Sequence, residues 1–126
     1  MTNESDKKKF SISARINSVT HAWRGIGILC RTSHNTWGHF FFSLLAVYLG
    51  FILHISSIEW AILVLAIGLV FVTETLNSAL EVDMDLTSPN YHPYARDTKD
   101  IAAGAVLLSV LVSAIIGLII FLPKII

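Results

Sequence analysis

The chain has 126 residues, which is enough for one domain. Apolar residues make up 54% of the chain, charged residues make up only 14%, and the mean hydropathy is +0.67. Because soluble domains usually carry about 25% charged residues, these values exclude an ordinary water-soluble globule and a disordered chain. Nine basic residues balance nine acidic ones, so we expect no nucleic-acid partner, and the single cysteine excludes an intramolecular disulfide. The composition indicates a small integral membrane protein.

The first two segments are polar and then amphipathic. Residues 1–9 are charged and lack the apolar run of a signal peptide, so we expect a disordered tail. In residues 10–31, apolar side chains recur at alternating steps of four and three, which predicts an amphipathic helix. The apolar positions are Ile12, Ile16, Val19, Trp23, Ile26 and Cys30. Arginines beside this stripe favour a helix that lies on the membrane surface with its basic side toward lipid phosphates.

Three later runs are long and apolar enough to cross a bilayer as helices. The runs are 38–55, 61–82 and 101–122. The first and third contain no Asp, Glu, Lys or Arg, whereas the second becomes polar from Thr73 onward. We expect residues 56–60 to form a short polar link, residues 84–100 a longer polar connection, and Pro123 to end the third span. The predicted fold is a single all-α integral membrane domain with one surface helix and three transmembrane helices.

Basic residues predict the orientation of these spans. Six precede the first span, two lie in the 84–100 connection and one follows the last span. They are Lys7, Lys8, Lys9, Arg15, Arg24 and Arg31, then Arg96 and Lys99, then Lys124. With three spans, the N-terminal segment and the long connection share one side, and the positive-inside rule makes that side cytoplasmic. We therefore expect a multi-pass protein of the cell's inner (cytoplasmic) membrane with its N-terminus in the cytoplasm.

The end of the second span carries polar side chains where lipid would forbid them. On a helix, Glu74, Asn77, Ser78, Glu81 and Asp85 share one side, which we call the polar face. A charged side chain inside the hydrocarbon costs about 2.5–3.5 kcal/mol on insertion scales. The polar face must therefore meet protein, water or a bound cation.

The residue types on the polar face suit phosphoryl transfer. Glu81 and Asp85 are one turn apart and can share Mg²⁺, which takes one or two carboxylates together with phosphate oxygens. At the start of the third span, Lys99 beside Asp100 can neutralise a phosphate as a point charge. Glu74 lies roughly 10 Å deeper along the helix than Glu81, at 1.5 Å per residue, and its desolvated position suits a general base. The pattern predicts transfer of a phosphoryl group from a cytosolic nucleotide to a lipid hydroxyl.

Two other interpretations of the polar face stay open at this point. A lone Asn77 inside a membrane is more often a bridge between helices than a catalytic group. The chain could also be a non-catalytic membrane oligomer whose acids stabilise assembly or conduct cations. That interpretation predicts no dependence on ATP and no lipid product, whereas the combination of the polar face with Lys99 and Asp100 favours an enzyme.

These same residues carry a resemblance to a known family. The segment E-T-L-N-S-A-L-E over 74–81, then Asp85, then His92-Pro93, then K-D-I-A-A-G-A-V over 99–106, resembles the prokaryotic integral-membrane diacylglycerol kinases. A weaker match over 21–26 and 31–35 extends the resemblance across nearly the whole chain. The His-Pro loop and the chain's last apolar run are similar to the Gram-positive branch of the family, which is chiefly undecaprenol kinase.

The resemblance implies an ATP- and Mg²⁺-dependent homotrimer whose sites are shared between subunits. By position, Glu74 would be the general base, Asn77 an essential catalytic residue and Glu81 a magnesium ligand. The residues that would contact the nucleotide are Asp85, Lys99 and Asp100. We also expect Ser78 and Glu74 to contact the lipid. The expected acceptor is undecaprenol, with diacylglycerol as the alternative.

The chain departs from the family pattern at two positions. Ser33 stands where the family usually has a second magnesium-binding Glu, and Ala14 stands where it has an Arg, with Arg15 next to it. Asp83 is an additional acid, but at 100° per residue it lies about 200° round the helix from Glu81. These departures leave open an altered number of magnesium ions or a weaker kinase.

Overall fold

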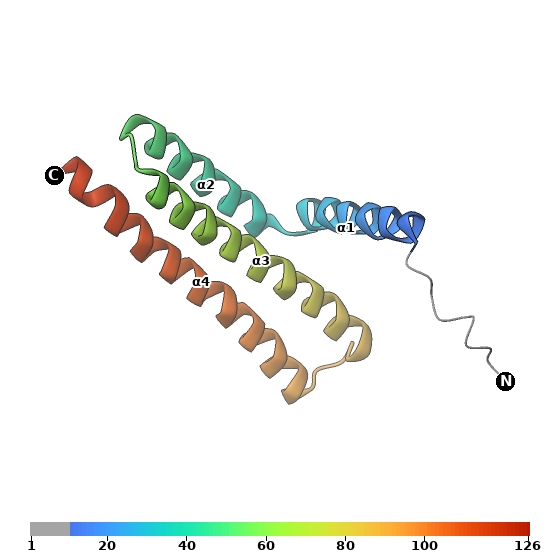
Figure 1. Cartoon of the computed structure of the whole chain (residues 1–126). Coiled ribbons are helices and arrows are strands. Elements are labelled where there is room, and N and C mark those ends of the chain that lie inside the picture. Colours follow the sequence, from blue (N-terminus) through green and yellow to red (C-terminus); the bar gives the residue numbers. More distant parts are fainter. Residues whose placement is uncertain (1–10) are drawn as a thin grey trace.

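The computed structural model of the chain describes residues 11–126, which form four α-helices and no strand (Figure 1). The helices are α1 (Ile12–Thr32), α2 (His34–Ile52), α3 (Ser57–Thr87) and α4 (Pro93–Ile125). Within this part of the chain, α2, α3 and α4 are long and apolar enough to cross a membrane. The expected all-α fold with three candidate spans is therefore confirmed. The disordered tail expected for residues 1–9 lies outside the described residues.

The helices α3 and α4 are longer than their apolar runs, whereas α2 begins before its run and ends at Ile52, three residues before the expected end at 55. The bounds of α3 and α4 correct three further expectations. The 84–100 connection is mostly helical, because α3 continues to Thr87 and α4 begins at Pro93. The expected link over 56–60 is also largely helix, since a capping box starts α3: the Ser56 backbone N–H donates to Glu59 Oε2 at 2.7 Å, and the Glu59 N–H donates to Ser56 Oγ at 3.2 Å.

Pro123 does not end α4, so that expectation is wrong. The helix runs through this residue to Ile125. Proline fixes φ near the helical value, so the chain stays helical, but it lacks the N–H that would bond the carbonyl of residue 119, and the last turn has one hydrogen bond fewer. The apolar run and the helix therefore end at different residues.

The pair α3 and α4 forms the main packing unit of the chain, and the two helices lie side by side along most of their length (Figure 1). Hydrogen bonds of hydroxyl groups link the two helices at two positions along the interface. The Thr73 and Ser109 hydroxyls lie 2.7 Å apart, and Ser113 Oγ donates to the Ala66 carbonyl at 3.0 Å. Small side chains and interhelical hydrogen bonds are the usual means of association between helices in lipid.

A small apolar core closes the end of the bundle where α2 turns into α3. Its buried members are Ile55, Leu63, Ile120 and Phe121. Gly50 is required here, because a Cβ at this position would lie 2.7 Å from the Trp60 ring. Lys124 Nζ pairs with Glu59 Oε1 at 3.2 Å and ties the end of α4 to the start of α3. This end of the bundle is therefore fixed by both apolar and ionic contacts.

The opposite end is built differently. Figure 1 shows α1 directed away from the bundle at the start of α2, while the α3–α4 hairpin extends well beyond that point. Trp37 Nε1 donates to the Cys30 carbonyl at 2.8 Å and holds the joint between α1 and α2. The apolar stripe of α1 is exposed, including Ile12, Ile16, Val19, Trp23 and Ile26. This arrangement places the α1–α2 joint beside the middle of α3, where the polar face begins.

Candidate active site

The polar face of α3 lines one cavity together with the joint between α1 and α2. All five residues of the face take part, and residues 32–35 close the cavity from the other side. The cavity has a volume of about 320 Å³. Asp83 is exposed and does not line it. The polar face therefore meets polar protein at this joint, as its cost in lipid requires.

Glu74 is the most deeply buried group of the site, with only 2% of its surface exposed. Ser33 Oγ donates a hydrogen bond of 2.8 Å to Glu74 Oε1. Glu74 Oε2 has no hydrogen-bond partner within residues 11–126. The nearest ionisable group to this oxygen is His39, whose Nε2 lies 3.6 Å away. A buried carboxylate oxygen without a donor is costly, and such an oxygen is well suited to receive a proton.

Asn77 lies one turn farther out and is also buried. Its Nδ2 donates to Glu81 Oε1 at 3.4 Å, whereas its Oδ1 has no hydrogen-bond partner in the described part of the chain. Ser78 is half-buried in the same cavity, and Glu81 is exposed. The site therefore holds a second buried oxygen without a hydrogen-bond partner among the described residues, Asn77 Oδ1, one turn from the exposed carboxylate of Glu81.

The outer end of the polar face reaches α4. Lys99 Nζ, near the start of α4, forms an ion pair with Asp85 Oδ1. Asp85 is eleven residues from Glu74, so at 1.5 Å per residue the face runs about 16 Å along the helix axis. Along this distance the acids change from fully buried to exposed. The site therefore extends from a buried inner end at Glu74 to an exposed, charged outer end at Asp85.

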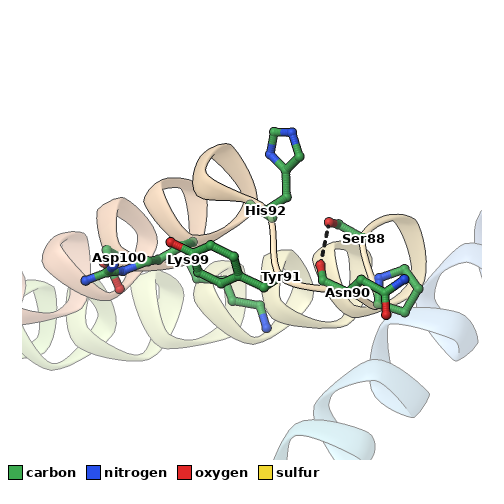
Figure 2. A pocket seen from close by; sticks show the side chains of 9 residues that line it. Ser88, Asn90, Tyr91, His92, Lys99 and Asp100 are labelled. Carbon is green, nitrogen blue, oxygen red and sulfur yellow. Dashed lines mark hydrogen bonds and ion pairs between the residues drawn. The ribbon is translucent and has the colours of Figure 1, made fainter.

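A second cavity lies at the turn between α3 and α4 (Figure 2). Lys99 and Asp100 line it together with Tyr91, and Figure 2 shows His92 directed away from them. Asp100 is exposed and pairs with Arg96 one turn earlier, with 3.8 Å between Nε and Oδ2. Asp100 thus lines this second cavity and not the first, whereas the Lys99–Asp85 pair stands between the two cavities.

Two residues of the site were not identified as such from the sequence. In the sequence, Ser33 is only a departure from a family pattern, and His39 is only one residue of the apolar run 38–55. A histidine inside a run with no other charge was the available signal. Neither contact with Glu74 is local, because Ser33 and His39 are 41 and 35 residues away in the chain.

The donor set fits a magnesium ion carried by a nucleotide. Among residues 11–126, no group of three or more His, Cys, Asp and Glu side chains could hold a metal alone. Mg²⁺ usually takes only one or two protein carboxylates and completes its shell with phosphate oxygens and water. Glu81 supplies an accessible carboxylate, and the vacant Asn77 Oδ1 lies on the same face one turn deeper.

Comparison with known proteins places the chain in one family. A family model described as prokaryotic diacylglycerol kinase matches residues 20–121. The chain is 45% identical over 107 residues to undecaprenol kinase of Bacillus subtilis (strain 168), covering 85% of this chain and 87% of that protein. It is 38% identical over 107 residues to a diacylglycerol kinase of Synechocystis, covering 84% and 61%. Diacylglycerol kinase of Escherichia coli (strain K12) is 35% identical over 72 residues, covering 57% and 59%.

The matched segment contains the whole polar face, the α1–α2 joint and both basic residues that start α4. The chain therefore belongs to the prokaryotic diacylglycerol kinase family, whose members are lipid kinases of the membrane.

Proposed function

We propose that the chain is an ATP-dependent kinase that phosphorylates the hydroxyl of undecaprenol at the cytoplasmic face of the membrane. The observation that carries the proposal is Glu74, a buried carboxylate with one vacant oxygen, at the inner end of a face whose outer end holds Lys99. The preference for undecaprenol is supported by the similarity to the Bacillus subtilis enzyme, which extends over most of both chains.

The proposed reaction uses the dry end of the face for the lipid and the charged end for the nucleotide. The lipid hydroxyl reaches Glu74, with Ser78 beside it in the same cavity. Glu74 takes the hydroxyl proton as the lipid oxygen bonds to the γ-phosphorus, and ADP leaves with the electrons of the broken bond. Asn77, one turn outward, orients the transferring group. Catalysis by positioning and charge stabilisation is typical of phosphoryl transfer.

Lys99, Asp85 and Asp100 form the proposed nucleotide site. When ATP binds, Lys99 leaves its ion pair with Asp85 and pairs with a phosphate group. The new pair is favoured because the phosphate carries more negative charge than one carboxylate. Glu81 and the Asn77 amide oxygen would hold Mg²⁺. The ion would neutralise charge on the phosphates.

The assembly that fits the site is a homotrimer with the N-terminus in the cytoplasm. Within one chain, at most 22% of the most apolar window of any candidate span is buried. One copy therefore leaves most of the surface of its spans uncovered, and neighbouring copies would cover part of it. The exposed apolar stripe of α1 suits a helix that lies on the inner leaflet.

The test of the proposed function is the Glu74→Gln substitution. Purified protein would be assayed for transfer of ³²P from ATP to undecaprenol in mixed micelles. Because general-base catalysis contributes about 10²–10⁴-fold, we expect turnover to fall by at least 100-fold. Glu59→Gln is the matched control, since Glu59 lies at the opposite end of α3 and should leave turnover unchanged. Wild-type turnover in Glu74→Gln would remove Glu74 from the base role.

Diacylglycerol is the second candidate acceptor. The relatives from Synechocystis and Escherichia coli bear the name diacylglycerol kinase, and the first of them matches most of this chain. Both lipids present a primary hydroxyl to the same base, so the polar face does not discriminate between them. Measuring kcat/KM for undecaprenol and for dioleoylglycerol in one assay decides the acceptor.

A further inference from the structure

The serine at the α1–α2 joint does not do what serines at helix starts usually do. At the other three helix starts, the side chains of Ser11, Ser56 and His92 each accept a hydrogen bond from a backbone N–H of the first turn. Ser33 is the N-cap of α2 but makes no such bond. Its hydroxyl instead donates a hydrogen bond to Glu74 Oε1. A serine N-cap normally stabilises its helix. Because the Ser33 hydroxyl bonds Glu74 instead, we infer that it serves the polar cavity and not the start of α2.

The hydroxyl of Ser33 makes the two oxygens of Glu74 unequal. Oε1 accepts the hydrogen bond of the serine at 2.8 Å, whereas Oε2 has no hydrogen-bond partner among residues 11–126. His39 Nε2 lies 3.6 Å from Oε2, which is too long for a hydrogen bond. An additional oxygen atom beside the pair can lie about 2.8 Å from both atoms at once, which is a normal hydrogen-bond length. The distance between Nε2 and Oε2 therefore suits one hydroxyl group that contacts both side chains.

His39 lies beside Glu74 of the polar cavity and also lines an apolar groove. It lines a groove of about 330 Å³ between α2, α3 and α4 that includes Ala66 and Val70 and extends to Phe121. The groove has no acidic or basic lining residue other than the histidine itself. A hydrocarbon chain in this groove would bring its hydroxyl end to His39, next to the vacant oxygen of Glu74.

We propose that Ser33 and His39 complete the acceptor site, an inference that rests on the proposed role of Glu74 as the base. Ser33 is a positioning residue that holds Oε1. His39 donates its Nε2–H to the oxygen of the lipid hydroxyl, and the hydroxyl donates its own hydrogen to Oε2. When the O–H bond breaks, the proton stays on Oε2 and the lipid oxygen bonds to the γ-phosphorus, while the bond from that phosphorus to the bridging oxygen breaks and its electron pair leaves with ADP.

The His39 arm of the test compares two substitutions of equal length. His39→Met removes the N–H donor, whereas His39→Gln supplies another one. Initial rates of ³²P transfer would be measured against both lipid and ATP. For His39→Met we expect kcat/KM for the lipid to fall about tenfold or more, the usual size of one lost hydrogen bond in a desolvated site, with KM for ATP unchanged. His39→Gln should recover most of the loss.

The Ser33 arm gives a different kinetic signature. Ser33→Ala should lower kcat about tenfold with KM for both substrates unchanged, because it frees the carboxylate to rotate without touching either substrate. Ser33→Thr keeps the hydroxyl and should retain activity within about twofold. Ser109→Ala is the matched control, since it also removes a buried hydroxyl but lies at the α3–α4 interface away from both cavities.

The outcomes separate this inference from the proposed function. If Glu74→Gln is inactive while His39→Met and Ser33→Ala keep wild-type kinetics, the acceptor site is wrong and the base stands. If Glu74→Gln is active, the base role itself is wrong. An equal loss in His39→Met and His39→Gln, or in Ser33→Ala and Ser33→Thr, would reduce that residue to a structural role. The midpoint of unfolding, measured for every variant, ensures that folded proteins are compared.

Discussion

The two ends of the α3–α4 pair use the same kinds of residue for different purposes. Each end joins an acid of α3 to a lysine of α4, Glu59 to Lys124 at one end and Asp85 to Lys99 at the other. At the first end, the Glu59 carboxylate accepts the Ser56 N–H of the capping box and pairs with the lysine, and a buried apolar core lies beside it. At the second end, the pair borders two cavities.

The difference lies in which polar groups are satisfied. Within the described part of the chain, the side chains of Glu74 and Asn77 each keep a buried oxygen without a hydrogen-bond partner. The carboxylate of Glu59 has no such vacancy. Native proteins rarely leave buried polar atoms unpaired, and those that remain often mark functional sites. The comparison therefore supports the proposal that the Glu74–Lys99 end is the functional site, whereas the contacts at the Glu59–Lys124 end stabilise the bundle.

Among variants of the two helix ends compared above, removing the lysine at the functional end should have the largest effect. In Lys99→Met, the phosphates of ATP lose a fixed positive charge, so we expect kcat/KM for ATP to fall on the order of 100-fold. Thermal unfolding with and without MgATP gives a second measure, because the ligand should no longer stabilise the protein. Wild-type kinetics in this variant would contradict the proposed nucleotide site.

Filling the tight contact at the fastened end should affect stability rather than chemistry. In Gly50→Ala, the new methyl group meets the Trp60 ring and the Ile55 side chain, so the α2–α3 end must open. Overpacking costs about 1–3 kcal/mol and exceeds the gain of about 1 kcal/mol from replacing a helical glycine. We expect the free energy of unfolding in SDS-containing micelles to fall by about 1 kcal/mol, with turnover retained. Gly25→Ala, where the added atom meets nothing within 4 Å, should not destabilise.

The three spans and the polar face could be predicted from the sequence, because both follow from the local order of apolar and polar residues. Apolar runs identified the three spans, and helical spacing placed Glu74 through Asp85 on one face. The sequence also places Lys99 at the same membrane boundary as the end of that face, because consecutive spans run antiparallel. The short connection over 88–92 that brings the two ends together is seen only in the structure. Each of these inferences needs only hydropathy and a period of 3.6 residues.

The remaining features depend on contacts that no local pattern contains. The last three turns of α3 are polar, so hydropathy ended the span at residue 82, although the helix continues to Thr87. The partners of Glu74 come from α2 and the joint before it, and their identity depends on how α2 rotates against α3. The sequence does not show that the Ser33 side chain bonds Glu74 and not the start of α2, because this follows only from the hydrogen bonds of the structure. Sequence periodicity gives the face of a helix but not the residue that meets it.

The smallest effect is expected where the comparison began, at Lys124. In Lys124→Met the pair with Glu59 is lost, but the capping box of α3 and the apolar core beside it stay in place. Partly exposed ion pairs contribute little, so the unfolding midpoint should fall only slightly and turnover should stay within about twofold of wild type. Measured beside Lys99→Met, this variant makes the same chemical change at the other end of the same helix pair. Equal losses of turnover in the two variants would mean that the lysines act through the stability of the bundle, and the division between a functional and a fastening end would then be wrong.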